Sequence, residues 1–225
     1  MAEPMVEVLD RRARRRQASI EEALGHALDV MAEQGVAGLS LGEVARRMGI
    51  RTPSIYVYFD SKNAMYDAIF ARGWRLLDDA VAAGLDEARR QPDLRSRFLH
   101  RARVFVEWAI SNPAYAQLMF WRPVPGWTPS ADAYQAAVDL AERNRDEMRT
   151  LQAQGLLRQD VDAEDLFLAW TVFASGVVSQ QLSNAPGASF DDGPYTTLLP
   201  QLVEMYVSLY ATSAGRRRAR TRRSS

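Results

Sequence analysis

Residues 39–62 read LSLGEVARRMGIRTPSIYVYFDSK and contain the clearest structural motif of the chain. Its segment Ser40-Leu41-Gly42-Glu43 has the spacing of a capping box, which begins a short helix. Gly49 ends that helix, and Thr52-Pro53 is typical of the N-cap and first position of a second one. Two short helices joined by a tight turn are the sequence form of a helix-turn-helix.

Elsewhere the apolar residues recur at spacings of three and four, which predicts an all-helical chain. The expected organisation is an N-terminal three-helix helix-turn-helix domain over 12–62, a larger helical domain over 63–212 and a basic disordered tail over 213–225. Glycines and prolines between the periodic segments predict about nine helices, near 14–34, 41–48, 53–59, 61–90, 93–111, 113–121, 129–154, 162–184 and 195–212.

The composition excludes several kinds of active site. The chain has 225 residues, no cysteine and two histidines, His26 and His100. Disulfides, thiolate metal sites and cysteine nucleophiles are therefore excluded, and neither a metal nor a cofactor is expected. The remaining carboxylates lie among arginines and are typical of solvated helix faces, so an enzyme is not expected.

Charge is distributed unevenly along the chain. Five arginines lie within 11–16 and six within 216–223, whereas 17–215 holds 17 basic and 25 acidic residues, net −8. Basic ends on an acidic body indicate an anionic partner. No apolar export segment begins the chain, and the apolar run Leu166–Val178 is shorter than the roughly 20 residues of a membrane span. A cytoplasmic protein that does not enter a membrane is expected.

The helix-turn-helix stretch resembles the TetR family of bacterial transcription regulators. The matching features are Gly49, Ile55-Tyr56, Tyr58-Phe59 and Ser61-Lys62, and the resemblance covers about residues 14–66. It implies a homodimeric DNA-binding regulator, most simply a repressor that a small-molecule effector releases from an inverted-repeat operator.

The same resemblance implies phosphate contacts from Ser40, Tyr56 and Lys62, although both tyrosines of this helix could instead be packing residues. It also implies that five residues lie near the bases, namely Arg51, Thr52, Pro53, Ser54 and Tyr58. Lys62 is the single lysine beside 27 arginines, and a flexible ammonium suits a phosphate. Beyond Arg51 this face has no Arg, Asn or Gln, so DNA shape is expected to contribute to sequence choice. Arg46 and Arg47 are expected to face outward, for phosphate contact or solubility.

Two apolar stripes in the larger half are candidates for the homodimer interface that the resemblance implies, since spacings of three and four suit helix pairing. The alternative is that they pack within one protomer. The stripes are Leu166, Trp170, Phe173, Val177 and Gln181, and Tyr195, Leu199, Leu202, Tyr206 and Leu209.

Many aromatic and few polar side chains in the larger half predict a pocket for a largely apolar effector. The loop Trp121–Trp127 is a candidate rim, although any single aromatic residue could belong to the core instead. The competing function is a DNA-binding scaffold without an effector, whose larger domain binds a protein partner. The candidate ligand-binding residues are His100, Phe105, Gln117, Trp121 and Tyr134.

Overall fold

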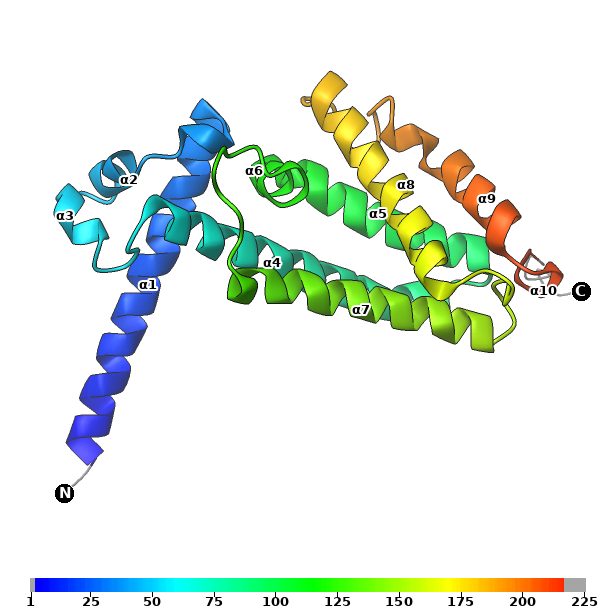
Figure 1. Cartoon of the computed structure of the whole chain (residues 1–225), viewed down its shortest axis with the longest axis horizontal. Helices are drawn as coiled ribbons and strands as arrows, with labels where there is room; N and C mark the ends of the chain where they lie inside the picture. The colour runs from blue at the N-terminus through cyan, green and yellow to red at the C-terminus, as the bar shows by residue number, and fades with distance from the viewer. Residues whose placement is uncertain (1–2, 217–225) are drawn as a thin grey trace, which may run out of the picture. The chain divides into compact units, whose positions relative to one another are not determined.

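The computed structural model describes residues 3–216, and over these residues the chain is helical, which confirms the predicted fold class (Figure 1). One isolated bridge joins Leu157 to Ala211. The elements in chain order are α1 Glu3–Gln34, η1 Val36–Gly38, α2 Leu41–Arg47, α3 Thr52–Ile55, α4 Lys62–Arg90, α5 Leu94–Ser111, α6 Pro113–Ala116, η2 Gln117–Trp121, α7 Ala131–Ala153, α8 Ala163–Asn184, η3 Thr196–Leu198, α9 Leu199–Tyr210 and α10 Ser213–Arg216.

The described chain divides into two compact units. The first contains the residues up to Gly73 together with Ala114–Tyr134, and the second contains Trp74–Pro113 together with the residues from Gln135 onward. Helices α4 and α7 each have their first residues in the first unit and the rest in the second. The first turns of α4 belong to the first unit because the buried Tyr66 hydroxyl donates to the carbonyl of Val36 at 2.7 Å. The division therefore falls later than the expected boundary at residues 62–63.

In the first unit, α1 packs against α2, and α2 packs against α3. The buried face of α1 includes Ala23, Ala27 and Val30, none of which is accessible to solvent. The side chains of Val44 on α2 and Ile55 on α3 are equally inaccessible. Burying side chains of this size stabilises the unit by roughly 1.5–3 kcal/mol for each valine or isoleucine.

An ion-pair cluster ties α1 to α2. Arg47 donates from Nη1 to Glu33 on α1 and from Nε to Glu43 on α2, each at 2.9 Å. Arg46 donates to the same Glu43 carboxylate at 2.7 Å. The expectation that Arg46 and Arg47 both face outward is therefore wrong for Arg47, whose side chain is 18% exposed. Glu43 accepts from arginines, whereas the capping box would have it reach back to the amide of Ser40.

The second unit is organised around α5, which packs against α8 and α9. Phe98 of α5 is buried, and its ring centroid lies 4.9 Å from the ring centroid of Trp170 on α8 and 5.0 Å from that of Tyr206 on α9. The Tyr206 hydroxyl donates to the carbonyl of Leu166 at 2.8 Å, and burial raises its pKa. Helices α8 and α9 lie side by side (Figure 1).

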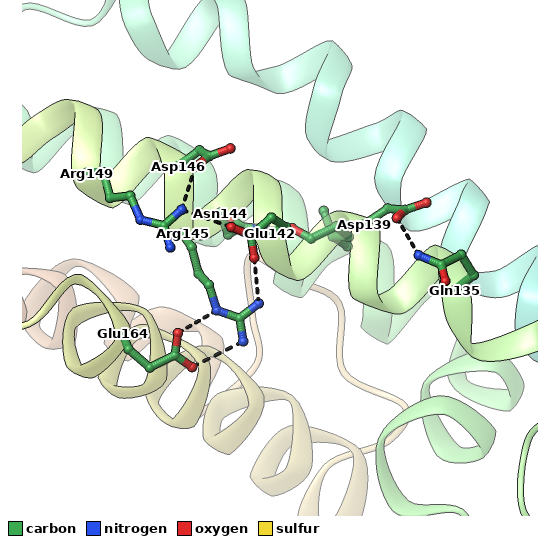
Figure 2. Close-up of polar contacts among 9 residues, drawn as sticks. Gln135, Asp139, Glu142, Asn144, Arg145, Asp146, Arg149 and Glu164 are labelled. Carbon is green, nitrogen blue, oxygen red and sulfur yellow. Dashed lines mark hydrogen bonds and ion pairs between the residues drawn. The ribbon is translucent and has the colours of Figure 1, made fainter. Parts of the chain in front are cut away.

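The start of α8 is fixed to α7 by charged side chains (Figure 2). Arg145 on α7 donates from Nη2 to Glu164 on α8 at 3.1 Å, and its guanidinium lies 4.6 Å from the centroid of the Phe167 ring. Glu142 accepts from Arg149 at 2.9 Å. The pKa of the Glu164 carboxyl is lowered chiefly by the hydrogen bond from Arg145.

Several residues of the two predicted interface stripes are buried within the protomer, so the intramolecular alternative is correct for them. These residues are Leu166, Trp170, Val177, Gln181, Leu199 and Tyr206. Leu209 of the predicted stripes is exposed, and so are Leu168, Val172 and Met205 on the same two helices, which the stripes did not include. Periodicity predicted that both helices are apolar, but it did not show that α8 is apolar on more than one face.

The two ends of the described chain differ from expectation. Helix α1 begins at Glu3, so Arg11–Arg16 are exposed residues of a helix that starts earlier than predicted. Ser213–Arg216 is helical, although a disordered tail was expected from residue 213. Gly215 is buried there, and a Cβ at this position would clash with the carbonyl oxygen of Leu156, so a side chain does not fit. The arginines after residue 216 lie outside the described residues.

Helix α8 is the one helix of the described chain that is long and apolar enough to cross a membrane. Core helices of globular proteins pass the same test, and Leu166, Trp170 and Val178 of α8 are buried within the protomer. Length and composition alone are therefore weak evidence for a membrane span.

The ion-pair cluster predicts how the first unit responds to pH. Hydrogen bonds from Arg46 and Arg47 lower the pKa of Glu43 from 4.5 to about 2. Because the folded-state pKa is depressed, the stabilising contribution is present above pH 4.5 and is lost as the pH falls towards 2. Glu43→Gln should therefore lower the melting temperature at pH 7 and lower it much less at pH 2.5, where most of this contribution is lost. Thermal unfolding at both pH values measures this, with the exposed Glu22→Gln as control. An equal melting-temperature difference at both pH values would contradict it.

Candidate nucleic-acid interface

The turn between α2 and α3 is built as a helix-turn-helix requires. Gly49 has a φ of 68°, a left-handed conformation that favours glycine, and the amide of Ile50 donates to the carbonyl of Ala45 at 3.0 Å. The Ser40 hydroxyl accepts from the amide of Glu43 at 3.5 Å and caps α2. The N-cap of α3 is Arg51, one residue before the predicted Thr52, so Pro53 lies within the first turn and misses no donor.

Helix α3 is shorter than predicted, because regular α-helix ends at Ile55 and residues 56–58 form a turn. The amide of Phe59 still donates to the carbonyl of Ile55 at 3.1 Å. The face opposite the buried Ile55 is open to solvent. Val57 is 68% exposed and Tyr58 is half-buried, while all four residues that begin the helix are exposed, namely Arg51, Thr52, Pro53 and Ser54.

The three predicted phosphate-contact residues meet at one depression of the surface. Ser40, Tyr56 and Lys62 line a cavity of about 530 Å³ together with Asp60 and Ser61. Hydroxyl groups and an ammonium group are donors that a phosphate oxygen accepts, and they lie beside the amides that begin α2. The Asp60 carboxylate is the unfavourable member of the set, because it repels an anion.

Lys62 makes intramolecular contacts that the sequence did not reveal. Its ammonium donates to the carbonyl of Ala37 in η1 at 3.0 Å and lies 5.4 Å from the centroid of the Tyr66 ring. Tyr66 donates to the adjacent carbonyl of Val36. Two side chains of α4 therefore fix the start of this helix to the segment that leads into α2.

The loop between η2 and α7 also belongs to the first unit. Trp127 is 5% exposed, and its indole N–H donates to the Asp67 carboxylate on α4 at 3.0 Å. Its ring centroid lies 5.4 Å from that of Tyr66 and 5.8 Å from that of Phe70. Trp127 is thus a core residue here, and no short-range pattern links it to a carboxylate 60 positions away.

The candidate ligand-binding residues are distributed over both units. Gln117 and Trp121 lie on η2 and Tyr134 on α7 in the first unit, whereas His100 and Phe105 lie on α5 in the second. Trp121 and Tyr134 are each 39% exposed. His100 lines a cavity of the second unit.

Tyr134 stacks on Phe70 with centroids 6.0 Å apart, and the Arg122 guanidinium lies 5.1 Å from the Tyr134 centroid. Arg122 has left-handed backbone angles, with φ 46°. Within the described part of the chain, no group of three or more His, Cys, Asp or Glu side chains could hold a metal ion.

Comparison with known proteins identifies the first unit. Residues 23–69 match the family described as "Bacterial regulatory proteins, tetR family". HTH-type transcriptional regulator YobS of Bacillus subtilis is 33% identical over 89 residues, and HTH-type transcriptional regulator Rv1816 of Mycobacterium tuberculosis is 29% identical over 100 residues. These matches cover 40% and 44% of this chain, and they span 44% and 42% of the two relatives, less than half of each. Regulators of this family are not enzymes, as the sequence predicted.

Solved structures share the fold over most of the chain. A protein of unknown function from Rhodococcus sp. RHA1 has a TM-score of 0.72 at 22% identity and covers 86% of this chain and 95% of its own. A regulator from Saccharomonospora viridis, solved in complex with choline, has a TM-score of 0.65 at 20% identity, covering 87% and 99%. FadR from Bacillus subtilis, solved in complex with stearoyl-CoA, has a TM-score of 0.65 at 12% identity, covering 84% and 97%.

Proposed function

The chain belongs to the TetR family, and we propose that it is a homodimeric, cytoplasmic transcriptional repressor that a small-molecule effector releases from its operator. The observation that carries the proposal is the joint placement of Ser40, Tyr56 and Lys62 at one depression, next to the exposed residues of α3. Phosphate contacts position a protein on DNA, and the exposed face of an inserted helix reads the base edges.

Two sets of residues would recognise the operator: those that line the depression and those that are exposed on α3. The phosphate contacts of the depression fix the register, and α3 enters the major groove with Arg51, Thr52, Pro53, Ser54 and Tyr58 near the bases. Arg51 can donate to a guanine edge, and the exposed methyl groups of Val57 can contact thymine. The exposed arginines of α1, Arg11–Arg16, add further positive charge to the first unit.

Dimerisation through α8 and α9 rests on their exposed apolar side chains. Val172 is 73% exposed, Met205 67% and Leu209 57%, and together they line a groove of about 490 Å³ whose wall also includes Leu202. An apolar groove along two adjacent helices favours pairing with the same face of a second copy, which would bury the groove. A dimer carries two α3 helices, as an inverted repeat requires.

An effector is supported by the relatives and by the size of the second unit. The S. viridis regulator was solved with choline and the B. subtilis FadR with stearoyl-CoA, so this fold accommodates small molecules of different chemistry. The candidate effector residues remain His100, Phe105, Gln117, Trp121 and Tyr134. The alternative, a DNA-binding scaffold whose second unit binds a protein, predicts no change of operator affinity with any small molecule.

The DNA-binding proposal is tested at Lys62. Lys62→Ala should weaken binding to all duplex sequences alike and make the slope of log affinity against log salt shallower by about one, because one phosphate contact is lost. The measurement is fluorescence anisotropy on labelled duplex DNA from 50 to 200 mM salt.

The control separates the effect of the Lys62 charge on DNA from the effect of its hydrogen bond to the segment before α2. Tyr66→Phe removes the hydrogen bond to Val36, on the same segment that Lys62 holds, but leaves the charge unchanged. It should keep the salt slope of the parent. If Lys62→Ala and Tyr66→Phe lower the affinity equally and leave the salt slope unchanged, Lys62 is an anchor of α4 and its phosphate role is wrong.

The dimer proposal is tested at Val172. Because this side chain is open to solvent in one protomer, Val172→Arg leaves the protomer fold intact but would bury an unpaired charge in the dimer, at a cost of several kcal/mol. Sedimentation velocity should show a monomer with unchanged helical circular dichroism. Val138→Arg on α7, where the parent residue is 43% exposed, is the matched control and should remain a dimer. A dimeric Val172→Arg variant would move the interface elsewhere.

A further inference from the structure

A cavity of the second unit is used neither by the DNA-contacting residues nor by the exposed groove of α8 and α9. It measures about 450 Å³ and lies between α5 and the segment that connects α8 to α9. This volume is within the range of about 300–1,000 Å³ that holds small-molecule ligands. Its apolar wall includes Leu99 of α5, Phe190 of the connecting segment and Leu199 of α9.

Three polar side chains of the cavity wall come from one face of α5, and four more come from the segments around it, namely Gln91, Asp191, Thr196 and Thr197. Ser96, His100 and Arg103 follow one another at helical spacing along α5. The Nε2 atom of His100 is buried and has no hydrogen-bond partner among the described residues. Gly84 on α4 lies against this ring: a Cβ at position 84 would be 3.5 Å from Nε2. The apolar side chains Leu99, Phe190, Leu199 and Pro200 thus lie beside polar groups that could fix the orientation of a ligand, as small-molecule sites require.

One arginine joins the two walls of this cavity. Arg103 donates from Nη2 to Asp191 of the connecting segment at 3.1 Å, and its guanidinium lies 4.6 Å from the centroid of the Phe190 ring. Its Nε is 3.5 Å from Glu107 on the next turn of α5. The Asp191 side chain is 77% exposed, and such surface ion pairs contribute about 0–1 kcal/mol. The Arg103–Asp191 pair is therefore easily exchanged.

The wall that carries Phe190 is held independently of this ion pair. Thr196, 2% exposed, donates to the carbonyl of Phe190 at 2.6 Å. Gln181, 1% exposed, donates to the carbonyl of Ala185 at 2.7 Å and accepts from the amide of Tyr195 at 3.3 Å. These buried hydrogen bonds fix the connecting segment at both ends, so the cavity is preformed and persists when Asp191 leaves Arg103.

We propose that this cavity binds an organic carboxylate with a compact apolar body. The ligand carboxylate replaces that of Asp191 on Arg103, whose planar fork accommodates two carboxylate oxygens, and the body packs on Leu99, Phe190 and Leu199. The cavity favours an anion over a cation because the Arg103 guanidinium stays at its wall, held by Phe190 and Glu107. The Asp191 carboxylate that it releases becomes fully solvated. As a site for the effector, this inference rests on the proposed function; as a carboxylate site, it stands independently.

The exchange has a consequence for the connecting segment. Asp191 lies between α8 and α9, the two helices whose exposed side chains are proposed to pair with a second copy. Binding of the carboxylate ends the contact that Asp191 makes with α5. Occupancy of the cavity thereby reaches the dimer-forming helices, and through them the spacing of the two α3 helices.

The experiment is isothermal titration calorimetry of the full chain at pH 7 with octanoate and with phenylacetate, and with 1-octanol and choline as probes of other charge. Both carboxylates are expected to bind, and octanol and choline at least about tenfold more weakly. Three variants identify the site. Arg103→Gln should weaken carboxylate binding about tenfold or more, and Asp191→Asn should strengthen it about threefold, because the competing carboxylate is removed.

The third variant, Arg149→Gln, is the matched control. Arg149 is 54% exposed and ion-paired, like the 50% exposed Arg103, but it does not line the cavity. It should leave carboxylate binding unchanged. The proposal is overturned if neither carboxylate binds, if choline or octanol binds as tightly as octanoate, or if Arg103→Gln and Asp191→Asn shift the affinity in the same direction.

Operator binding is measured separately on the same variants. Because Arg103→Gln and Asp191→Asn both end the Arg103–Asp191 ion pair, as ligand binding does, both should bind the operator more weakly than the parent without ligand. Octanoate should release DNA from the parent and cause no further release from Arg103→Gln. Carboxylate binding without DNA release would leave the site standing and overturn its role as the effector site. Loss of operator binding by the parent itself would overturn the proposed function and leave the calorimetric result intact.

Discussion

The left-handed backbone at Gly49 is the constraint on which the DNA-facing unit depends. With φ at 68°, the chain reverses between α2 and α3 tightly enough for Ile55 to close on Val44 and Ala45 without any solvent access. Closure of that apolar contact turns the opposite face of α3 outward and brings Tyr56 to the depression that Ser40 lines. A side chain at position 49 would strain this conformation, and the α3 face would lose its orientation.

Two helices carry the chain from the first unit into the second. Lys62 and Tyr66 fix the start of α4 to the segment before α2, and Trp127 fixes the loop before α7 to α4 through Asp67. Hydrogen bonds within the first unit therefore hold the start of α4 and the loop that leads into α7. A ligand that alters operator affinity a hundredfold needs a coupling free energy of about 2.7 kcal/mol between the two sites.

Local rules predicted the all-helical class, the cap at Ser40 and the turn at Gly49, because each depends on residues close in sequence. They failed where the deciding partner is distant. Arg47 points inward because of Glu33, which lies 14 positions earlier on another helix, and Trp127 is buried because of Asp67. On α8 the periodicity identified an apolar helix but could not say which face meets α5 and which stays exposed, as at Val172. The cavity beside His100 needs three segments that only the fold brings together.

Selection of bound fragments from random duplex DNA tests operator recognition by a dimer, since it requires both an intact α3 face and two copies of the chain. We expect an enriched inverted repeat whose half-site centres are about 34–36 Å apart along the duplex, one helical turn. Recovery of fragments no different from the starting library, or of a single unrepeated motif, would contradict recognition by a dimer through α3.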